Sequence, residues 1–163
     1  MKTIYLAGGC FWGVEKYFEQ FDGVLNTEVG YANGNKEDPT YQEVRTQMTG
    51  FTETLKLDYD PEVLPLRKVL ELYYDIVEPT VRDRQGHDVG NNYRTGIYYT
   101  DEADLPLIEE ITAEEQKKYS EPIVTERMPL KNFYKAEEYH QKYLDKNPGG
   151  YCHIPREKLS LKR

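Results

Sequence analysis

Cys10 is the residue whose type and position most clearly suit chemistry, because it follows two glycines at the end of a short apolar run. The pattern predicts a strand over residues 2–7 and an amphipathic helix over residues 11–20. The free N–H groups and the positive end of the dipole at a helix start favour a thiolate over a thiol. Cys10 is therefore expected to be a nucleophile, although a buried and inert thiol fits this local pattern too.

Two aromatic residues, Phe11 and Trp12, directly follow this cysteine, and Trp12 is the only tryptophan in the chain. Two rings beside a nucleophilic sulfur would form an apolar wall suited to a methyl or thioether group. Glu15 lies one turn further along the same expected helix. It could serve either the helix or the site.

Expected strands and helices alternate along the chain, and together they must position these residues. Further strands are expected over residues 24–31, 54–59, 94–100 and 122–126. Further helices are expected over residues 65–77, 105–119 and 134–144. Residues 80–92 read as a polar loop, and the chain after Pro148 reads as irregular.

This interleaving favours an α+β fold over a doubly wound parallel sheet. We expect a two-layer, ferredoxin-like sandwich with a mixed sheet and an irregular C-terminal tail. No repeat or linker marks a boundary, so residues 1–163 are expected to form a single catalytic domain, with the tail over residues 148–163.

Charge and composition bear on the possible partners. The formal net charge is −8, which argues against nucleic acid, since phosphate contacts need clustered Lys and Arg. No apolar run approaches the length that spans a bilayer, and the stretch at residues 4–7 is too short for a signal peptide. Two cysteines do not make a secreted disulfide framework. We expect a cytoplasmic monomer that needs no membrane, metal ion or cofactor.

Segments in the same order along nearly the whole chain resemble the A-type peptide methionine sulfoxide reductases. The octamer Gly8-Gly9-Cys10-Phe11-Trp12-Gly13-Val14-Glu15 is similar to the signature of that family. The later matching segments are Gly30-Tyr31-Ala32-Asn33-Gly34, Pro39-Thr40-Tyr41-Gln42-Glu43-Val44, Thr49-Gly50-Phe51-Thr52-Glu53, Tyr59-Asp60-Pro61, Asp88-Val89-Gly90-Asn91-Asn92-Tyr93-Arg94 and Gly150-Tyr151-Cys152.

The resemblance implies an enzyme that reduces the S epimer of methionine sulfoxide, free or in proteins, and so repairs oxidised proteins. Carried over by matching motif, Cys10 attacks the sulfoxide sulfur and becomes a sulfenic acid as methionine leaves. Glu53 is then the general acid for the sulfoxide oxygen. A carboxyl that stays protonated near neutral pH needs a desolvated setting.

The resemblance also implies residues that bind the substrate. Tyr41 and Tyr93 match two tyrosines whose hydroxyls point at the sulfoxide oxygen, and neutral donors there would not lower the pKa of the acid. Phe11 and Trp12 would form the pocket for the ε-methyl group. Asp88 matches an aspartate that helps to hold the substrate or its hydrogen-bond network, with simple turn chemistry as the alternative.

Cys152 matches the first recycling cysteine of the family. The two glycines before it predict a tail flexible enough to bring its thiol to Cys10. The resulting Cys10–Cys152 disulfide would be reduced by thioredoxin. Many relatives carry a further cysteine a few residues on, whereas this chain has none, so the relay is expected to end at one disulfide.

The chain departs from the family pattern at three positions near these motifs. Residues that are often His, Gln and Ser in the family are here Phe51, Asn92 and Thr95. The expected acid and tyrosines are unchanged, but the finer hydrogen-bond network around Asp88 is not carried over.

Other classes of protein use the same types of residue. A thiol peroxidase also pairs two cysteines, but it needs a polar, often Arg-bearing pocket rather than two rings beside the sulfur. A cysteine hydrolase would take His87, His140 or His153 as its base, yet most of these histidines are expected at the surface. A metal-binding module lacks C-x₂-C or H-x₃-H spacing. A non-catalytic interaction domain would leave Cys10 dispensable.

Overall fold

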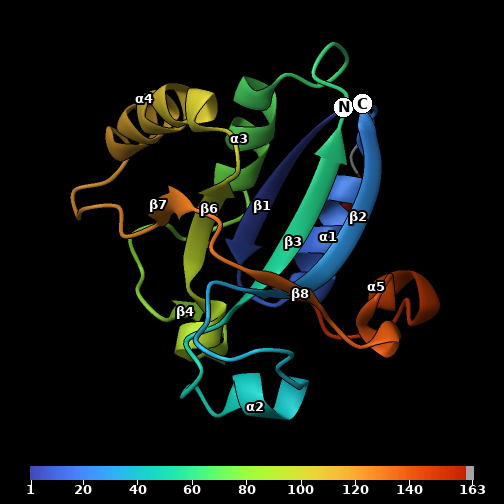
Figure 1. The fold of residues 1–163 in the computed structure, drawn as a ribbon. Coiled ribbons are helices and arrows are strands. Elements are labelled where there is room, and N and C mark those ends of the chain that lie inside the picture. Colours follow the sequence, from blue (N-terminus) through green and yellow to red (C-terminus); the bar gives the residue numbers. More distant parts are fainter. Residues whose placement is uncertain (161–163) are drawn as a thin grey trace.

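The computed structural model in Figure 1 describes residues 1–160, so the last three residues of the expected tail lie outside the described part. The strands are β1 (Lys2–Gly8), β2 (Val24–Ala32), β3 (Thr52–Tyr59), β4 (Arg84–Gln85), β5 (Asp88–Val89), β6 (Thr95–Tyr99), β7 (Glu126–Pro129) and β8 (Phe133–Lys135). The α-helices are α1 (Phe11–Glu19), α2 (Tyr41–Arg45), α3 (Leu66–Tyr74), α4 (Leu105–Gln116) and α5 (Tyr143–Lys146). Short 3₁₀ helices are η1 (Asn91–Tyr93), η2 (Glu102–Asp104), η3 (Glu138–His140) and η4 (Arg156–Ser160).

One sheet organises the chain, with the strand order β7-β6-β1-β3-β2-β8. Strand β1 pairs antiparallel with β3 and β6, and β2 pairs antiparallel with β3 and β8. Strand β7 runs parallel to β6, while β4 and β5 form a separate two-stranded sheet. The predicted combination of helices with a mixed sheet is therefore confirmed.

Both faces of this sheet are covered, but by different parts of the chain. Ile4 and Leu6 of β1 are fully buried in the large apolar cluster that includes side chains of α1 and α3. These two helices lie behind the sheet in Figure 1. Ala7 points to the opposite face, since successive residues of a strand alternate, and it belongs to a smaller cluster against which Phe133 packs. The start of α1 thus meets the sheet at the end of β1.

The helix predicted over residues 134–144 is wrong. Residues 133–135 form β8, which pairs with β2, and the short helices η3 and α5 follow it. The Gln141 side chain accepts a hydrogen bond from the Val29 N–H and donates one to the Val29 carbonyl, both at 2.9 Å. Backbone groups at the edge of β2 need partners, and this requirement outweighs the local helical pattern.

Several short elements also differ from the prediction: β4 and β5 lie within residues 80–92, expected to be a loop, and η4 lies in the tail, expected to be irregular. Helix α2 was not predicted, although it begins with a capping box in which Thr40 accepts from the Glu43 N–H and Glu43 accepts from the Thr40 N–H. This signal is visible in the sequence, but the helix has only 5 residues. The strand expected over residues 122–126 instead begins at Glu126 as β7. The remaining predicted strands and helices differ only at their ends, where such boundaries are least certain.

Glu15 serves the framework rather than the site. Its buried carboxylate accepts hydrogen bonds from the Thr27 hydroxyl and from the Lys142 N–H, both at 2.7 Å. A buried carboxylate needs such partners to offset the loss of water. Glu15 therefore fixes α1 to β2 and to the segment that leads into α5.

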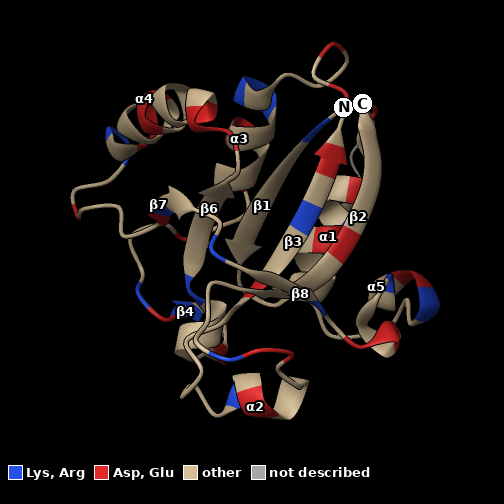
Figure 2. Cartoon of the chain, viewed as in Figure 1, with Lys and Arg blue, Asp and Glu red and all other residues tan. Residues whose placement is uncertain are grey.

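Over the part of the chain that the structure describes, charged side chains do not gather into one basic surface. Figure 2 shows Lys and Arg scattered over separate elements, with Asp and Glu between them. Within residues 1–160, no helix has the length and apolar character needed to cross a membrane.

Candidate active site

Cys10 lies at the junction between β1 and α1, where it is the N-cap residue of the helix with φ −58° and ψ 123°. The preceding Gly9 has φ +88°, a left-handed conformation that glycine adopts without strain. A Cβ at Gly9 would lie 2.8 Å from the Cβ of Gln85 and 2.9 Å from the Nε2 of His153. The glycine therefore lets two distant segments approach the backbone beside the thiol.

The thiol of Cys10 is buried, with 7% of the residue exposed. Burial raises its pKa well above the ordinary range, and the nearby charge of Glu53 raises it further. The Trp12 backbone N–H lowers the pKa, but by less than burial raises it. Desolvation therefore outweighs the effect of the helix start, which by itself favours a thiolate, and Cys10 is held towards the neutral thiol.

Glu53 of β3 lies at the same helix start. It is only 1% exposed, and its Oε1 accepts a hydrogen bond from the Phe11 N–H at 3.2 Å. Burial raises the pKa of Glu53 to about 8, and the charge of Asp88 adds to the effect, while the Phe11 N–H and the Asn92 side chain oppose it. The carboxyl is therefore largely protonated at neutral pH.

Tyr41 and Tyr93 flank this pair from two different elements. Tyr41 is the first residue of α2, and Tyr93 is the last residue of η1. Burial and the charge of Glu53 raise the pKa of both tyrosines, and each is also raised by Cys10. Both hydroxyls consequently stay neutral and can donate hydrogen bonds.

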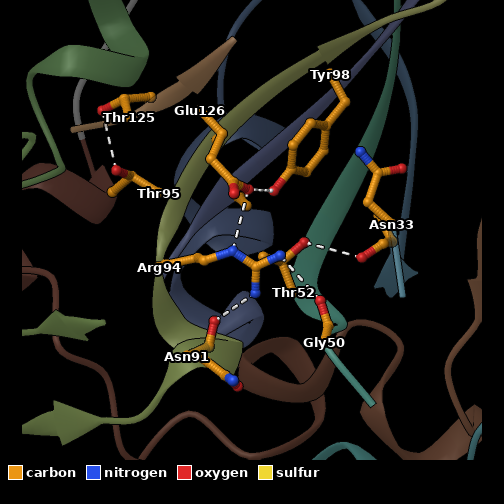
Figure 3. Close-up of polar contacts among 12 residues, drawn as sticks. Asn33, Gly50, Thr52, Asn91, Arg94, Thr95, Tyr98, Thr125 and Glu126 are labelled. Atoms are coloured by element: carbon orange, nitrogen blue, oxygen red, sulfur yellow. Dashed lines mark hydrogen bonds and ion pairs between the residues drawn. The ribbon is translucent and has the colours of Figure 1, made fainter. Parts of the chain in front are cut away.

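Arg94 holds the short segment that carries Tyr93. Its guanidinium donates to the Asn91 carbonyl at 2.8 Å, to the Gly50 carbonyl at 2.9 Å and to Glu126 Oε1 at 3.1 Å (Figure 3). These bonds connect η1 to the loop before β3 and to β7. The elements bearing Tyr93 and Glu53 are thus fixed by one side chain.

Phe11 and Trp12 surround a residue that the sequence did not single out as buried, His140. Its ring centre lies 5.2 Å from that of Phe11 and 5.8 Å from that of Trp12. The Trp12 Nε1–H donates to His140 Nδ1 at 2.9 Å, and the indole stacks on Tyr143 at 3.7 Å. His140 also lies 4.7 Å from the ring of Tyr41, so it connects the aromatic residues with one of the tyrosines.

His140 is 1% exposed, which contradicts the prediction that most of the histidines lie at the surface. His153 is half-buried and only His87 is exposed. Burial lowers the pKa of His140 and of His153. No local pattern marks His140, because its partners come from α1 and α2, which lie far away in the sequence.

Asp88 and Cys152 complete the set of predicted residues. Asp88 begins β5 and accepts a hydrogen bond from the Tyr151 hydroxyl at 3.1 Å. Cys152 is half-buried, and its Sγ would lie 2.7 Å from a Cβ at Gly13. Both Asp88 and Cys152 raise the pKa of Cys10, and both cysteines are free thiols. The predicted site residues therefore converge on the start of α1.

The side chains at the three positions that depart from the family pattern are all buried. Phe51 is buried against Tyr134, with 5.9 Å between ring centres. Asn92 is buried next to Glu53, and the Thr95 hydroxyl pairs with that of Thr125 at 2.9 Å. Within residues 1–160, no group of three or more His, Cys, Asp or Glu side chains is arranged to hold a metal ion.

The contact between Trp12 and His140 predicts a spectroscopic signal. Trp12 is the only tryptophan, so fluorescence excited at wavelengths that the indole absorbs and tyrosine does not reports on Trp12 alone. We expect the wild-type emission to titrate with a midpoint below the ordinary histidine pKa of about 6.5, because burial lowers the pKa of His140. His140→Phe should abolish that titration and shift the emission, since it removes the acceptor of the indole N–H. Tyr139→Phe, which keeps the neighbouring ring, is the matched control, and an unchanged titration in His140→Phe would contradict this assignment.

The raised pKa of Glu53 predicts how stability depends on pH. The unfolded chain ionises this group near the ordinary pKa of about 4.3, whereas the folded chain does so at about 8. The stabilising contribution of neutral Glu53 is therefore complete below about pH 4.3 and is lost progressively as the pH rises from there through about 8. Glu53→Gln should unfold at a higher temperature than wild type above pH 8, and the difference should shrink towards pH 5.

Thermal denaturation across that range measures the effect. Glu114→Gln, which alters an exposed carboxyl paired with Arg67, should show no comparable pH dependence. A difference between Glu53→Gln and wild type that is independent of pH would contradict the buried neutral carboxyl.

Known proteins resemble this chain over almost its full length. The family described as "Peptide methionine sulfoxide reductase" matches residues 2–163. The peptide methionine sulfoxide reductase MsrA of Clostridium acetobutylicum is 64% identical over 159 residues, which is 98% of this chain and 98% of that protein. The MsrA of Lachnoclostridium phytofermentans is 59% identical over 94% of this chain and 92% of that protein.

Solved structures agree with the sequence relatives. The reduced form of Mxr1 from Saccharomyces cerevisiae has a TM-score of 0.90 at 41% identity, covering 99% of this chain and 92% of that one. Mxr1 in complex with Trx2 has a TM-score of 0.63 at 31% identity, covering 87% of this chain and 84% of that one. On these grounds the chain belongs to the peptide methionine sulfoxide reductase family.

Proposed function

We propose that this peptide methionine sulfoxide reductase works by direct attack of the Cys10 thiol on the sulfoxide sulfur. The observation that carries the proposal is the buried carboxyl of Glu53 at the same helix start, bonded to the Phe11 N–H at 3.2 Å. Breaking the S–O bond requires a proton on the oxygen, and a carboxyl with a pKa of about 8 carries one at neutral pH. Nucleophile and acid are therefore paired.

In the first step one thiol and one sulfoxide give one sulfenic acid and one thioether. The oxygen is transferred from the substrate to the sulfur of Cys10, so this step needs no other reductant. Glu53 supplies the proton to the oxygen, and the proton of the Cys10 thiol returns to the Glu53 carboxylate, so the carboxyl is neutral again at the end of the step. The neutral hydroxyls of Tyr41 and Tyr93 donate hydrogen bonds to the same oxygen and stabilise the charge that develops on it.

Substrate binding is assigned to the aromatic residues and to Asp88. Phe11 and Trp12 form an apolar wall for the ε-methyl group of methionine-S-sulfoxide, and the Trp12 indole is held by its bond to His140. Asp88 helps to hold the substrate or the hydrogen-bond network, which is supported by its bond to Tyr151. The preference for the S epimer rests on the family resemblance.

The enzyme is then regenerated through Cys152. Its thiol condenses with the Cys10 sulfenic acid to form a disulfide, which a thioredoxin reduces by thiol–disulfide exchange. The existence of Mxr1 in complex with Trx2 supports a reductant of this class. Because the chain has only 2 cysteines, the reductant must attack the Cys10–Cys152 bond itself.

The finer architecture is part of the same proposal. The central strand order β6-β1-β3-β2, antiparallel throughout, supports a ferredoxin-like sandwich with α1 and α3 on one face. We infer a single catalytic domain over residues 1–163 that acts as a monomer in the cytoplasm, without nucleic acid or membrane partners. Two free thiols are consistent with such a reducing compartment.

Substitution of the two cysteines tests the reaction sequence. Cys10→Ser should release no methionine from the sulfoxide, because it lacks the nucleophile. Cys152→Ser should release one equivalent per enzyme and keep a sulfenic acid on Cys10, yet fail to turn over with thioredoxin. The measurement is methionine release from each separated epimer, with hydrogen peroxide as the alternative substrate. Near wild-type release by Cys10→Ser, or sustained turnover by Cys152→Ser with thioredoxin, would contradict the assignment.

Substitution of Glu53 tests the acid. Glu53→Gln should slow the reductase step by about a hundred-fold or more, the usual contribution of a general acid. In wild type the rate of this step should fall as the pH rises through about 8, where Glu53 loses its proton. Single-turnover rates across pH should show that Glu53→Gln lacks this decline. A decline that persists in the variant would assign the proton to another group.

A further inference from the structure

The tail that carries Cys152 lies directly on α1. A Cβ built at Gly13 would lie 2.7 Å from Cys152 Sγ and 3.2 Å from Ile154 Cδ1, so a side chain at residue 13 would have to displace the sulfur. Residues three apart lie on one face of a helix, and Gly13 is three residues after Cys10. The second thiol therefore lies about one turn along from the first.

The residue after Cys152 is anchored to the backbone just before Cys10. The His153 Nε2–H donates to the Gly8 carbonyl at 2.9 Å, and its imidazole lies where a side chain at Gly9 would project. This hydrogen bond thus holds the backbone that precedes Cys10 close to the residue that follows Cys152. Glycine at residues 9 and 13 leaves room for both His153 and Cys152.

Other contacts hold the tail on both sides of Cys152. The Tyr151 hydroxyl donates to Asp88 Oδ2 at 3.1 Å. Further along, the Arg156 guanidinium donates to the carbonyls of Pro148 and Gly150, each at 2.8 Å, and so closes the turn that contains the two glycines. The tail predicted to be flexible is therefore docked while both cysteines are free thiols.

We propose that Gly13 and His153 are positioning residues that hold the Cys152 thiol beside Cys10 before the sulfenic acid forms. The inference rests on the proposed function, because it concerns the step after methionine release. In that step the Cys152 sulfur attacks the Cys10 sulfur, the S–S bond forms and the S–O bond breaks. The oxygen leaves as water with the thiol proton, so no further oxidant or reductant is required.

In a chain with a single recycling cysteine, docking of that cysteine on α1 affects how long the Cys10 sulfenic acid persists. A sulfenic acid that persists can be oxidised further to a sulfinic acid, which thiols do not reverse. With Cys152 already on α1, the lifetime of the Cys10 sulfenic acid is set by the chemistry of disulfide formation rather than by a search of the tail.

Gly13→Ala tests directly whether the position of Cys152 against α1 governs disulfide formation. It adds a methyl group where the sulfur lies, while alanine suits a helix interior better than glycine. Single-turnover methionine release should stay close to the wild-type rate. Disulfide formation should slow by about ten- to a hundred-fold, as expected when reacting groups are displaced by about 1 Å. Rapid quenching followed by mass spectrometry, with dimedone to trap the sulfenic acid, separates the two steps.

Gly149→Ala is the matched control, because a Cβ at Gly149 would meet no atom within 4 Å. It should resolve the sulfenic acid at the wild-type rate. His153→Leu removes the anchor to Gly8 without touching residue 13, and it should slow disulfide formation as well. This second variant carries the test should Gly13→Ala fold poorly.

Wild-type rates of disulfide formation in both Gly13→Ala and His153→Leu would overturn the proposed positioning roles of Gly13 and His153. Slow resolution in Gly149→Ala as well would also overturn it, since any change in the tail would then suffice. Absence of methionine release by the wild-type enzyme would instead overturn the proposed function, and that result is read in the first step alone.

Discussion

The hydrogen bond from the Phe11 N–H to the buried Glu53 carboxyl is the contact on which the site depends. It joins a central strand of the sheet to the helix that begins at Cys10. The first N–H groups of a helix have no partner within the helix, and a carboxyl at this point satisfies one of them. The positions of thiol and acid are thereby set by the packing of α1 on β3 rather than by mobile side chains.

The same burial favours the neutral forms of the groups at the helix start. It raises the pKa of Cys10 and of Glu53 and lowers that of His140, so each of these groups is held towards its neutral form. A sulfoxide is a dipole and not an ion, so a neutral acid and neutral hydroxyls suit its oxygen better than a buried cation would. A cation beside Glu53 would lower the pKa of the carboxyl and remove its proton.

Three glycines also organise the structure around the start of α1. Residues 8, 9 and 13 have no side chain where the helices, the β4–β5 segment and the C-terminal tail approach. Close approach is the property that glycine supplies at these positions. As a result, a segment about 140 residues further along the chain returns to the thiol and brings the only other sulfhydryl with it.

The sequence by itself determined the parts that depend on neighbouring residues. The strand that ends in two glycines, the helix that starts after Cys10 and most of the other elements follow from local periodicity and backbone sterics. The family resemblance added the identities of Glu53, Tyr41 and Tyr93. Only the tertiary structure decided that Cys10 is held towards the neutral thiol, that His140 is buried, and that β8 and two short helices replace the predicted helix over residues 134–144. These features depend on desolvation and on contacts between residues such as Trp12 and His140, 128 positions apart, and no local pattern encodes either.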